Sequence, residues 1–400
     1  MDLRSGETVW LLKHGCPPVY PTLSEDLECD VAIIGGGITG ALIAHELGAV
    51  GFKCVLIDKR EPGGGSTSAS TSLLSFELDT PLWELAGLIG EEDAVASYQA
   101  CIESIHKIEK VVKELSIPCD FIRRKSYYFA ETGRDVHNLE KEVTMRRKHD
   151  VPVEFLQQRE IEGLFSFSRP AALLSEPAAE IDVVEFVASL FKAAKATGLQ
   201  AYGHTTMVNH EAAKDRITLT TDKGHIITAR KLVFATGYES EKYLGYKIGS
   251  LKSTYAIATA PVPDFPGWHD RSLIWTSARP YLYLRTTADN RAIIGGEDID
   301  FQDEKHRDSL LPEKTAKLEN QLRALFPALE FELACAWAGT FGETEDSLAC
   351  IGRKPEQPDI YYALGYGGNG ITYSMIAAEI IRDSCLGREH PSARLFRLDR

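Results

Sequence analysis

A glycine-rich turn near the start of the sequence has the spacing of a phosphate-binding loop. Residues 35–40 read Gly-Gly-Gly-Ile-Thr-Gly, a match to G-x-G-x-x-G that directly follows the apolar run of residues 31–34. In this pattern the first glycine permits a tight turn, the second lets a pyrophosphate approach the backbone, and the third lets a helix pack closely on the strand. Asp58 ends the next apolar run, where a carboxylate can accept hydrogen bonds from ribose hydroxyls. These residues predict a dinucleotide-binding site.

Two segments far along the chain indicate which dinucleotide is bound. Residues 231–237 form an apolar run that ends in Ala-Thr-Gly, and residues 365–370 read Gly-Tyr-Gly-Gly-Asn-Gly before a helical pattern. Two glycine turns at helix starts, in distant parts of the chain, suit a long ligand. The dipole of the second helix would stabilise the anionic ring of a reduced flavin. An NAD-dependent dehydrogenase is the weaker alternative, because it would continue with further βα units.

The order and spacing of these motifs resemble a known flavoenzyme family. The matching segments are DVAIIGGGITG, IDKREPGGGSTSAS, KLVFATGY, the pair YLYLR and IIGGED, and GETEDSLACIG followed by YYALGYGGNGIT. Across about residues 29–385 the chain is similar to the FAD-dependent D-amino-acid oxidase superfamily, particularly its glycine oxidase and sarcosine oxidase branch. The resemblance implies an enzyme that oxidises a C–N bond of an amine or amino acid by hydride transfer to flavin N5. A non-catalytic, FAD-binding assembly or chaperone-like subunit of the same fold is the alternative.

The resemblance also implies which residues hold the FAD. The Ser/Thr-rich loop after Asp58 would lie along the flavin and the pyrophosphate, and the strand at Met207 would touch the adenine side. Gly339, Gly352 and the turn at 367–372 would lie on the isoalloxazine side. The implied cofactor-binding residues are Gly35, Gly37, Ile38, Thr39, Gly40, Asp58, Lys59, Ser66, Thr67, Ser68, Thr71, Ser72, Leu73, Met207, Ala235, Thr236, Gly237, Gly339, Gly352, Gly367, Gly368, Asn369, Gly370, Ile371 and Thr372.

The mode of flavin attachment also follows from the resemblance. In this family a covalent flavin is attached to a histidine in the N-terminal segment or to a cysteine before the C-terminal FAD strand. No histidine occurs from Val50 to Ala100, and Gly339 fills the cysteine position, about four residues after Cys335. We therefore expect the FAD to be bound non-covalently.

The substrate side departs from the family pattern. Sarcosine-oxidase-like proteins hold the substrate carboxylate with an arginine near the end of the Ser/Thr-rich loop and a lysine just inside the last helix. In this sequence the two positions are Ser75 and Thr372, which carry no charge. A substrate carboxylate would therefore need another partner.

A predicted hairpin supplies the candidate catalytic residues. Alternation along a strand would point Arg279, Tyr281, Tyr283 and Arg285 to one face. On this basis the candidates are Tyr283, as a wall of the substrate pocket, with Arg279 and Arg285. Each arginine has an alternative interpretation as a solvated surface charge. Counting along the hairpin puts Ile294 at the position of the lysine that assists oxygen reduction in sarcosine-oxidase-like proteins, which predicts a slow reaction with oxygen.

The elements that must position these residues begin with a βαβ unit. Residues 31–34, 38–50 and 53–57 predict strand, helix and strand, which require a parallel sheet. Further helices are expected at 83–115, 135–149, 183–197, 312–325 and 371–385, and strands at 121–130, 199–208, 216–221, 225–235, 252–260, 281–287 and 291–297. The first 29 residues are expected to be irregular.

These elements predict an α/β fold with two parts. One is a Rossmann-like FAD-binding domain built from discontinuous segments, and the other is an α+β substrate domain with a mixed sheet. After a lead-in at 1–29, we expect the FAD-binding domain at 30–85, 151–245 and 335–400, and the substrate domain at 86–150 and 246–334.

Composition restricts the partners. The 400-residue chain has a net charge of −14, which disfavours nucleic acid because phosphate backbones would be repelled. No apolar run reaches the ~18 residues of a membrane span. The eight cysteines include no CxxC and the eleven histidines no HxxxH, so we expect no metal site. The expectation is a cytoplasmic enzyme with a small-molecule amine or amino-acid substrate, and the sequence leaves a homodimer open.

Overall fold

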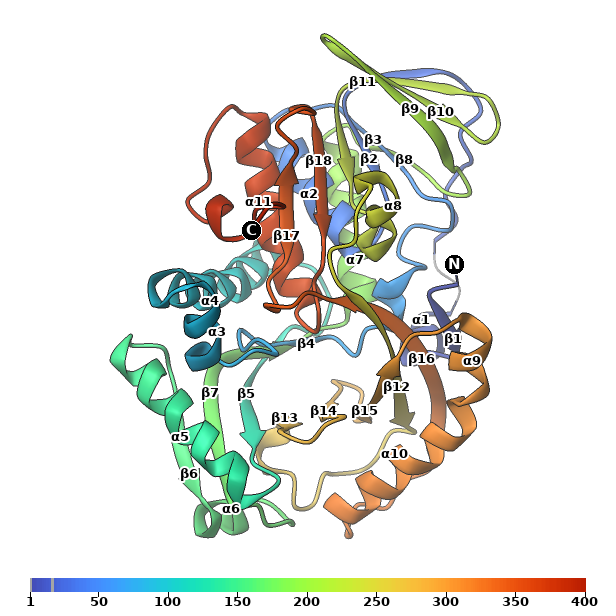
Figure 1. Cartoon of the computed structure of the whole chain (residues 1–400). Helices are drawn as coiled ribbons and strands as arrows, with labels where there is room; N and C mark the ends of the chain where they lie inside the picture. The colour runs from blue at the N-terminus through green and yellow to red at the C-terminus, as the bar shows by residue number, and fades with distance from the viewer. Residues whose placement is uncertain (1, 16–17) are drawn as a thin grey trace.

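The protein consists of two β-sheets with helices packed against them (Figure 1). The structure is a computed structural model that describes residues 2–15 and 18–400. The smaller sheet occupies the upper half of Figure 1 and the larger sheet the lower half, and the chain crosses between the halves several times. Segments that are far apart in the sequence therefore meet where the two halves join.

The smaller sheet has a parallel centre, in agreement with the expected Rossmann-like fold. Its eight strands are β2 (Leu27–Ile34), β3 (Cys54–Ile57), β8 (Gln200–Tyr202), β9 (Met207–Ala213), β10 (Arg216–Thr221), β11 (Ile226–Phe234), β17 (Cys350–Arg353) and β18 (Ile360–Leu364). The strands β18-β11-β2-β3-β8 pair in parallel, and β17 adds an antiparallel edge. The first half of β11 also pairs with the β9–β10 hairpin.

The larger sheet is mixed and has ten strands. In spatial order they are β1 (Arg4–Gly6), β16 (Leu333–Glu343), β12 (Ser250–Thr259), β15 (Ala292–Asp300), β14 (Leu282–Thr286), β13 (Leu273–Thr276), β5 (Ile122–Phe129), β7 (Ala171–Glu180) and β4 (Leu73–Leu74), with β6 (Glu154–Gln157) beside β7. The pairing of β13 with β5 is parallel and the other pairings are antiparallel.

Eleven helices lie within the described residues. They are α1 (Val9–His14), α2 (Ile38–Ala49), α3 (Leu82–Ile89), α4 (Glu91–Glu114), α5 (Gly133–Lys148), α6 (Gln158–Leu164), α7 (Val183–Ala196), α8 (Glu241–Leu244), α9 (Glu304–Ser309), α10 (Leu311–Leu325) and α11 (Gly370–Cys385), with 3-10 turns η1 (Ser66–Ala69), η2 (Gly237–Ser240), η3 (His269–Arg271) and η4 (Ala393–Leu395). Five of the helices, α1, α5, α6, α7 and α9, begin at a residue whose side chain caps the helix. The carboxylate of Asp182 caps α7 by accepting from the Glu185 N–H at 3.1 Å. None of the helices within residues 2–15 and 18–400 is both long and apolar enough to cross a membrane.

Two apolar layers fix the faces of the larger sheet. Its inner face shares a core with α2, α7 and α11 of the smaller-sheet half, and this core includes Ile293 and Trp337. Its outer face packs on α10, where Ile294 lies in a cluster with Leu318 and Leu322. Residues that alternate along β14 and β15 therefore alternate between the flavin-binding half and the outer helix.

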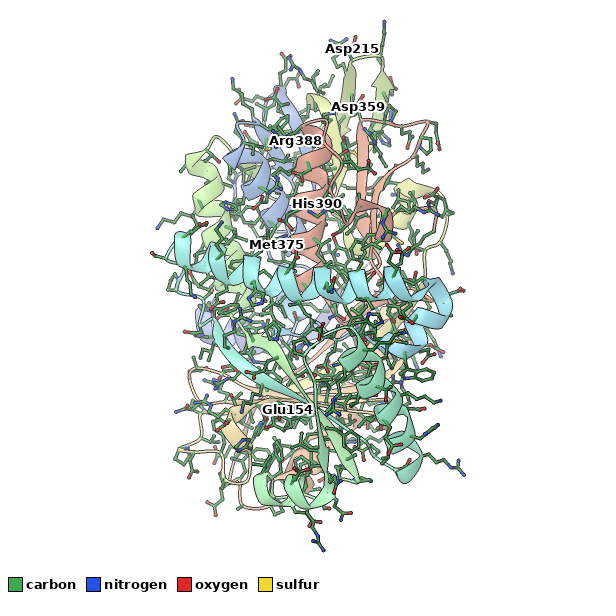
Figure 2. The ribbon with its side chains drawn as sticks, turned by 90° about the vertical axis from the view of Figure 1, so that its left-hand side faces the viewer. Glu154, Asp215, Asp359, Met375, Arg388 and His390 are labelled. Carbon is green, nitrogen blue, oxygen red and sulfur yellow. The ribbon has the colours of Figure 1, made fainter. Side chains whose placement is uncertain are left out.

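Helix α4 supports the start of α11 from below. Figure 2 shows α4 as the long helix that crosses the molecule, with Met375 of α11 above it and the strand of Glu154 below. The hydroxyl of Ser104 donates to the Thr372 carbonyl at 2.7 Å, and the Lys107 ammonium contacts Glu379 at 2.8 Å. The first turn of α11 is thus anchored from outside the smaller sheet.

Three features differ from the sequence-based expectations. The lead-in contains β1 and α1, and β1 pairs with β16. The helix expected at 83–115 is divided at Gly90, whose φ of 91° suits glycine. Strands β6, β7 and β16 belong to the larger sheet, although their residues fall largely in segments that we expected to form the FAD-binding domain.

Candidate FAD and substrate site

The glycine motif forms the turn from β2 into α2, and its backbone leaves no room for side chains. A Cβ on Gly35 would lie 2.4 Å from the Ala235 carbonyl oxygen, and one on Gly40 would lie 2.0 Å from the Gly35 carbonyl oxygen. Gly37 caps α2 without a side-chain hydrogen bond. The first turn of α2, which carries Ile38 and Thr39, therefore starts beside a turn shaped by backbone, and the Ile38 N–H donates to the Thr67 hydroxyl at 3.0 Å.

Asp58 follows β3 and binds the glycine turn. One carboxylate oxygen accepts from the Gly36 N–H at 2.7 Å and the other from the Arg60 N–H at 2.8 Å. Burial raises the pKa of Asp58, although both hydrogen bonds oppose the rise. The neighbouring Lys59 ammonium pairs with Glu239 of η2 at 2.5 Å. Asp58 therefore shapes the turn as well as offering carboxylate oxygens beside it.

The Ser/Thr-rich loop is held in place by hydrogen bonds at three of its residues. At its start, in η1, the Thr67 hydroxyl accepts from the Ile38 N–H at 3.0 Å. Further along, the indole N–H of Trp337 donates to the Ala69 carbonyl at 2.8 Å, and that of Trp10 donates to the Ser70 carbonyl at 2.7 Å. Neither tryptophan could be predicted as a partner of the loop, because both come from segments that pack beside it only in the folded chain.

The turn that opens α11 lies against the segment after β4. The side-chain amide of Asn369 donates to the carbonyls of Ser75 and Glu77, each at 3.0 Å. The Thr372 hydroxyl donates to the Ser75 carbonyl at 3.3 Å. The two positions that would carry cations in sarcosine-oxidase-like proteins are thus in contact, and a hydroxyl fills each.

The remaining cofactor-binding candidates do not all lie beside the glycine turn and the Ser/Thr-rich loop. The Ala235 N–H donates to the Ile34 carbonyl at 2.9 Å, which sets the end of β11 beside the glycine turn. Gly339 faces η1, because a Cβ there would lie 3.3 Å from Ala69 Cβ. Met207 lies in the apolar cluster on the other face of the smaller sheet. Gly352 faces Leu398, so the structure does not bring it together with the other candidates.

The hairpin tyrosines line the inner face of the larger sheet. The Tyr283 hydroxyl and the Thr254 hydroxyl are 3.0 Å apart, and a Cβ on the facing Gly295 would overlap the Tyr283 ring. The Tyr281 ring lies 5.7 Å from it, centre to centre. A Cβ on Gly368 would be 3.7 Å from the Tyr281 hydroxyl. Burial raises the pKa of Tyr283, so this phenol is neutral at physiological pH.

The two arginines of the hairpin have different surroundings. Arg279 is exposed, and its guanidinium lies 5.4 Å from the centre of the Tyr281 ring. Arg285 is buried and donates to the carbonyls of Ser72 and Ile181 at 2.8 and 2.9 Å. It also donates to the Thr71 carbonyl at 3.2 Å. Its alternative interpretation as a solvated charge is therefore wrong, and its contacts are with the loop.

The expected position of Ile294 is wrong. Ile294 points to the outer face, into the cluster on α10, and Ile293 points to the inner face. Neighbouring residues of a strand point to opposite faces, so a count that is wrong by a single residue places a side chain on the wrong face. Ile294 therefore does not face the flavin-binding half, and it gives no reason to expect a slow reaction with oxygen.

Sequence reasoning missed a group of carboxylates near the tyrosines. Burial is the main cause of the raised pKa of both Tyr281 and Tyr283, and the charge of Asp298 of β15 adds to each rise. Burial raises the pKa of Asp298 to about 7, with smaller upward contributions from Glu343 and Asp79. Asp79 accepts from the Gly368 N–H at 3.3 Å. Asp298 was within the motif IIGGED, but only the bulge described below turns it inward.

The residues present fit an FAD molecule. Both α2 and α11 start without a side-chain hydrogen bond at the cap, and the residues at their starts are the glycine-rich segments. Within 4 Å, a Cβ on Gly37 would meet only Thr67 Oγ1, and one on Gly370 would meet nothing. One helix end suits a pyrophosphate and the other suits the pyrimidine carbonyls of a flavin.

Comparison with known sequences agrees with this geometry. The profile of the DAO family, FAD dependent oxidoreductase, matches residues 30–384. A putative Rieske 2Fe-2S iron-sulfur protein of Bacillus subtilis is 25% identical over 395 residues, which cover 98% of this chain and 75% of that protein. The gamma-glutamylputrescine oxidoreductase of Escherichia coli is 26% identical, with 92% and 86% covered. The glycine oxidase of Geobacillus kaustophilus is 24% identical, with 88% and 92% covered.

Solved structures share the fold. The crystal structure of glycine oxidase from Geobacillus kaustophilus superposes with a TM-score of 0.79 at 21% identity and covers 94% of this chain and 99% of its own. The L-proline dehydrogenase of P. horikoshii superposes with a TM-score of 0.77 at 21% identity, with 94% and 98% covered.

Proposed function

Because the chain belongs to the DAO family of FAD dependent oxidoreductases, we propose that it oxidises the C–N bond of an amine or amino acid with non-covalently bound FAD. The substrate carbon loses a hydride and its nitrogen loses a proton, so that C–N becomes C=N. Water then releases a carbonyl compound and an amine or ammonia. Bound FAD supplies the hydride acceptor, and the two electrons pass on to oxygen or to another external acceptor.

The observation that supports this function most directly is that side chains from the larger-sheet half lie beside Gly368 in the turn before α11. The turn before α11 fits the flavin end of the cofactor, and the Tyr281 hydroxyl and the Asp79 carboxylate lie within 4 Å of a Cβ placed on Gly368. A substrate between the flavin and the hairpin would therefore be walled by Tyr281 and Tyr283. Relatives named for glycine and for gamma-glutamylputrescine indicate that this fold serves different amino compounds.

The residues divide into two groups in this proposal. Gly35, Gly37 and Asp58 hold the dinucleotide end, where backbone and ribose contacts are made. Tyr283 and Tyr281 form one wall of the substrate pocket. Arg285 is a positioning residue, because it holds the Ser/Thr-rich loop through hydrogen bonds to the Thr71 and Ser72 carbonyls. Arg279 stays a candidate for contact with substrate at the rim.

The experiment is turnover with an amine library and an electron-accepting dye, with products analysed by mass spectrometry. We expect one carbonyl product for each two-electron reduction of dye. Parallel reactions in air measure the share of electrons taken by oxygen. A flavin-loaded protein that forms no carbonyl product from any amine would contradict the proposal and leave the non-catalytic alternative. Acid precipitation that leaves the yellow colour on the polypeptide would contradict non-covalent binding.

A further inference from the structure

A β-bulge turns one carboxylate of β15 toward the flavin side. The register between β12 and β15 shifts so that Glu297 and Asp298 together oppose Thr254, and Glu297 has a φ of 57°. Glu297 points outward, where it accepts from Lys314 at 3.0 Å and from Gln321 at 3.1 Å. Asp298 points the other way, toward Thr254 and Tyr283. The bulge therefore separates a paired outer acid from an inner one.

The inner acid has an oxygen without a protein partner. Asp298 Oδ1 is buried and has no hydrogen-bond partner among residues 2–15 and 18–400. Such an atom is costly unless something else satisfies it. Two further acids, Glu343 and Asp79, lie close enough to raise its pKa. The substrate side of the cofactor site is thus short of positive charge.

The cations near this group are already engaged or lie at the rim. The Lys252 ammonium pairs with Asp300 at 2.6 Å, and the Lys314 ammonium pairs with Glu297 at 3.0 Å. Arg279 is exposed. Ser75 and Thr372 are uncharged, as described above. A cationic ligand would be attracted by the negative charge of Asp298 and would balance it, whereas a carboxylate placed beside Asp298 would be repelled.

A cavity of about 250 Å³ lies between the larger sheet and helices α3 and α5. Asp79 connects this cavity with the flavin end of the cofactor site, because it lines the cavity and also accepts a hydrogen bond from the Gly368 N–H. The cavity exceeds the ~150 Å³ that is enough to hold benzene in an apolar interior. It has room for an aromatic ring and several further atoms.

Aromatic side chains form the wall of this cavity. Tyr128 and Trp275 are paired across β5 and β13, with ring centres 3.9 Å apart at 24°. Trp83 of α3 also lines it. Of the two lining cations, Arg146 is neutralised by Glu142 and Glu77 at 2.5 and 2.9 Å, and Arg279 lies at the exposed rim. Four acids also line the cavity, namely Asp79, Glu84, Asp135 and Glu142. The cavity therefore suits a flat, uncharged group rather than an anionic one.

We infer that the substrate is an arylalkylamine without an α-carboxylate, with its ammonium group at Asp298 and its aryl group in the cavity lined by Trp275 and Tyr128. This inference rests on the proposed function and names its substrate class. Asp298 and Trp275 are then specificity-determining residues, the first for charge and the second for the aryl group.

The test is calorimetric binding of unreactive probes to the FAD-loaded protein. The probes are benzyltrimethylammonium, tetramethylammonium and phenylacetate. We expect benzyltrimethylammonium to bind at least ten-fold more tightly than tetramethylammonium, and phenylacetate to show no saturable binding. Asp298→Asn should weaken binding of benzyltrimethylammonium about ten-fold or more, since it removes the charged partner. Trp275→Ala should remove the preference for the aryl cation.

The matched control is Asp300→Asn, which removes one negative charge two residues along the same strand. Asp300 is exposed and pairs with Lys252, so this variant should bind the probes like the unaltered protein. The inference is overturned if phenylacetate binds as tightly as benzyltrimethylammonium, or if Asp298→Asn binds the cation as well as Asp300→Asn does.

A second pair of compounds separates this inference from the proposed function. N-methylphenethylamine and N-methylphenylalanine differ only by the α-carboxylate, and each is mixed anaerobically with the FAD-loaded protein. We expect the amine to reduce the flavin at least ten-fold faster. Faster reduction by the amino acid would overturn the inference and leave the proposed function standing. Reduction by neither, with benzyltrimethylammonium bound, would contradict the proposed function instead.

Discussion

The two ends of the cofactor site differ in the groups that form them, which are mainly backbone at one end and side chains at the other. The dinucleotide end consists of backbone: a glycine turn, the start of α2, and Asp58, whose oxygens both accept from backbone N–H groups. The substrate end consists of side chains on separate strands, with Tyr283, Thr254 and Asp298 brought together by a bulge. Backbone N–H groups recognise a phosphate in any member of such a family. Side chains on strands can change with the substrate while the backbone stays the same, so we expect the second end to determine this protein's substrate specificity.

The largest effect is expected at the dinucleotide end. In Gly40→Ala the new Cβ would lie 2.0 Å from the Gly35 carbonyl oxygen, so α2 must move away from the glycine turn. We expect purified protein with almost no flavin, measured by absorbance. Gly87→Ala in α3 is the control, because a Cβ there meets nothing within 4 Å. A normal flavin content in a folded Gly40→Ala protein would contradict the close packing.

The next effect separates the two hairpin arginines. Arg285→Met removes the donors to the Thr71, Ser72 and Ile181 carbonyls, so the Ser/Thr-rich loop should loosen. We expect FAD affinity to fall by about ten- to a hundred-fold, as loss of buried charge-assisted hydrogen bonds would do. Arg279→Met should keep its full flavin content. Unchanged FAD affinity in Arg285→Met with lost turnover would instead make Arg285 a catalytic residue.

A smaller effect is expected at the substrate wall. Tyr283→Phe removes the hydroxyl that pairs with Thr254 at 3.0 Å but keeps the ring over Gly295. We expect several-fold slower flavin reduction by amines, with FAD affinity unchanged, since one neutral hydrogen bond contributes about 1 kcal/mol. The measurement is the anaerobic reduction rate beside a flavin titration. Loss of FAD from this variant would move Tyr283 from the substrate wall to the cofactor site.

The smallest effect concerns stability and pH. The pKa of Asp298 is raised from 3.8 to about 7, mainly by burial, while Thr254 and Lys314 oppose the rise and Glu343 and Asp79 add to it. A carboxyl group with a raised pKa stabilises the fold at low pH, and this contribution is lost as pH rises through about 7. Asp298→Asn should therefore raise the melting temperature of the holoprotein by about 1–3 °C at pH 8.5. The rise should be smaller at pH 5.5, because this pH lies between 3.8 and about 7 and only part of the contribution has been lost there. Equal rises at both pH values would contradict the assigned titration.

The contrast between the two ends also explains what the sequence could predict. The motif at 35–40, Asp58 and the turn at 365–370 are contiguous patterns, so their elements and the Rossmann-like sheet were predicted correctly. Tyr281 and Tyr283 share the inner face, as alternation predicted. Trp10 and Trp337 could not be found, because their hydrogen bonds to residues 69 and 70 depend on how distant segments pack.

An error of register and one β-bulge explain what was not predicted on the substrate side of the site. Ile294 was assigned to the inner face by counting, and an error of a single residue in such a count reverses the face. Asp298 was overlooked because alternation does not hold through the bulge at Glu297. Arg285 lies on the face that alternation predicts, but its contacts could not be predicted, because the Thr71 and Ser72 carbonyls come from a loop more than 200 residues earlier.

The most direct test of the central claim is the absorption spectrum of the pure, FAD-loaded protein before and after anaerobic addition of amines. The account predicts an oxidised flavin spectrum that bleaches on addition of N-methylphenethylamine and returns when an electron-accepting dye is added. The rate of bleaching should saturate with amine concentration. A flavin spectrum that stays oxidised with every amine tested, in protein that binds FAD fully, would contradict the account.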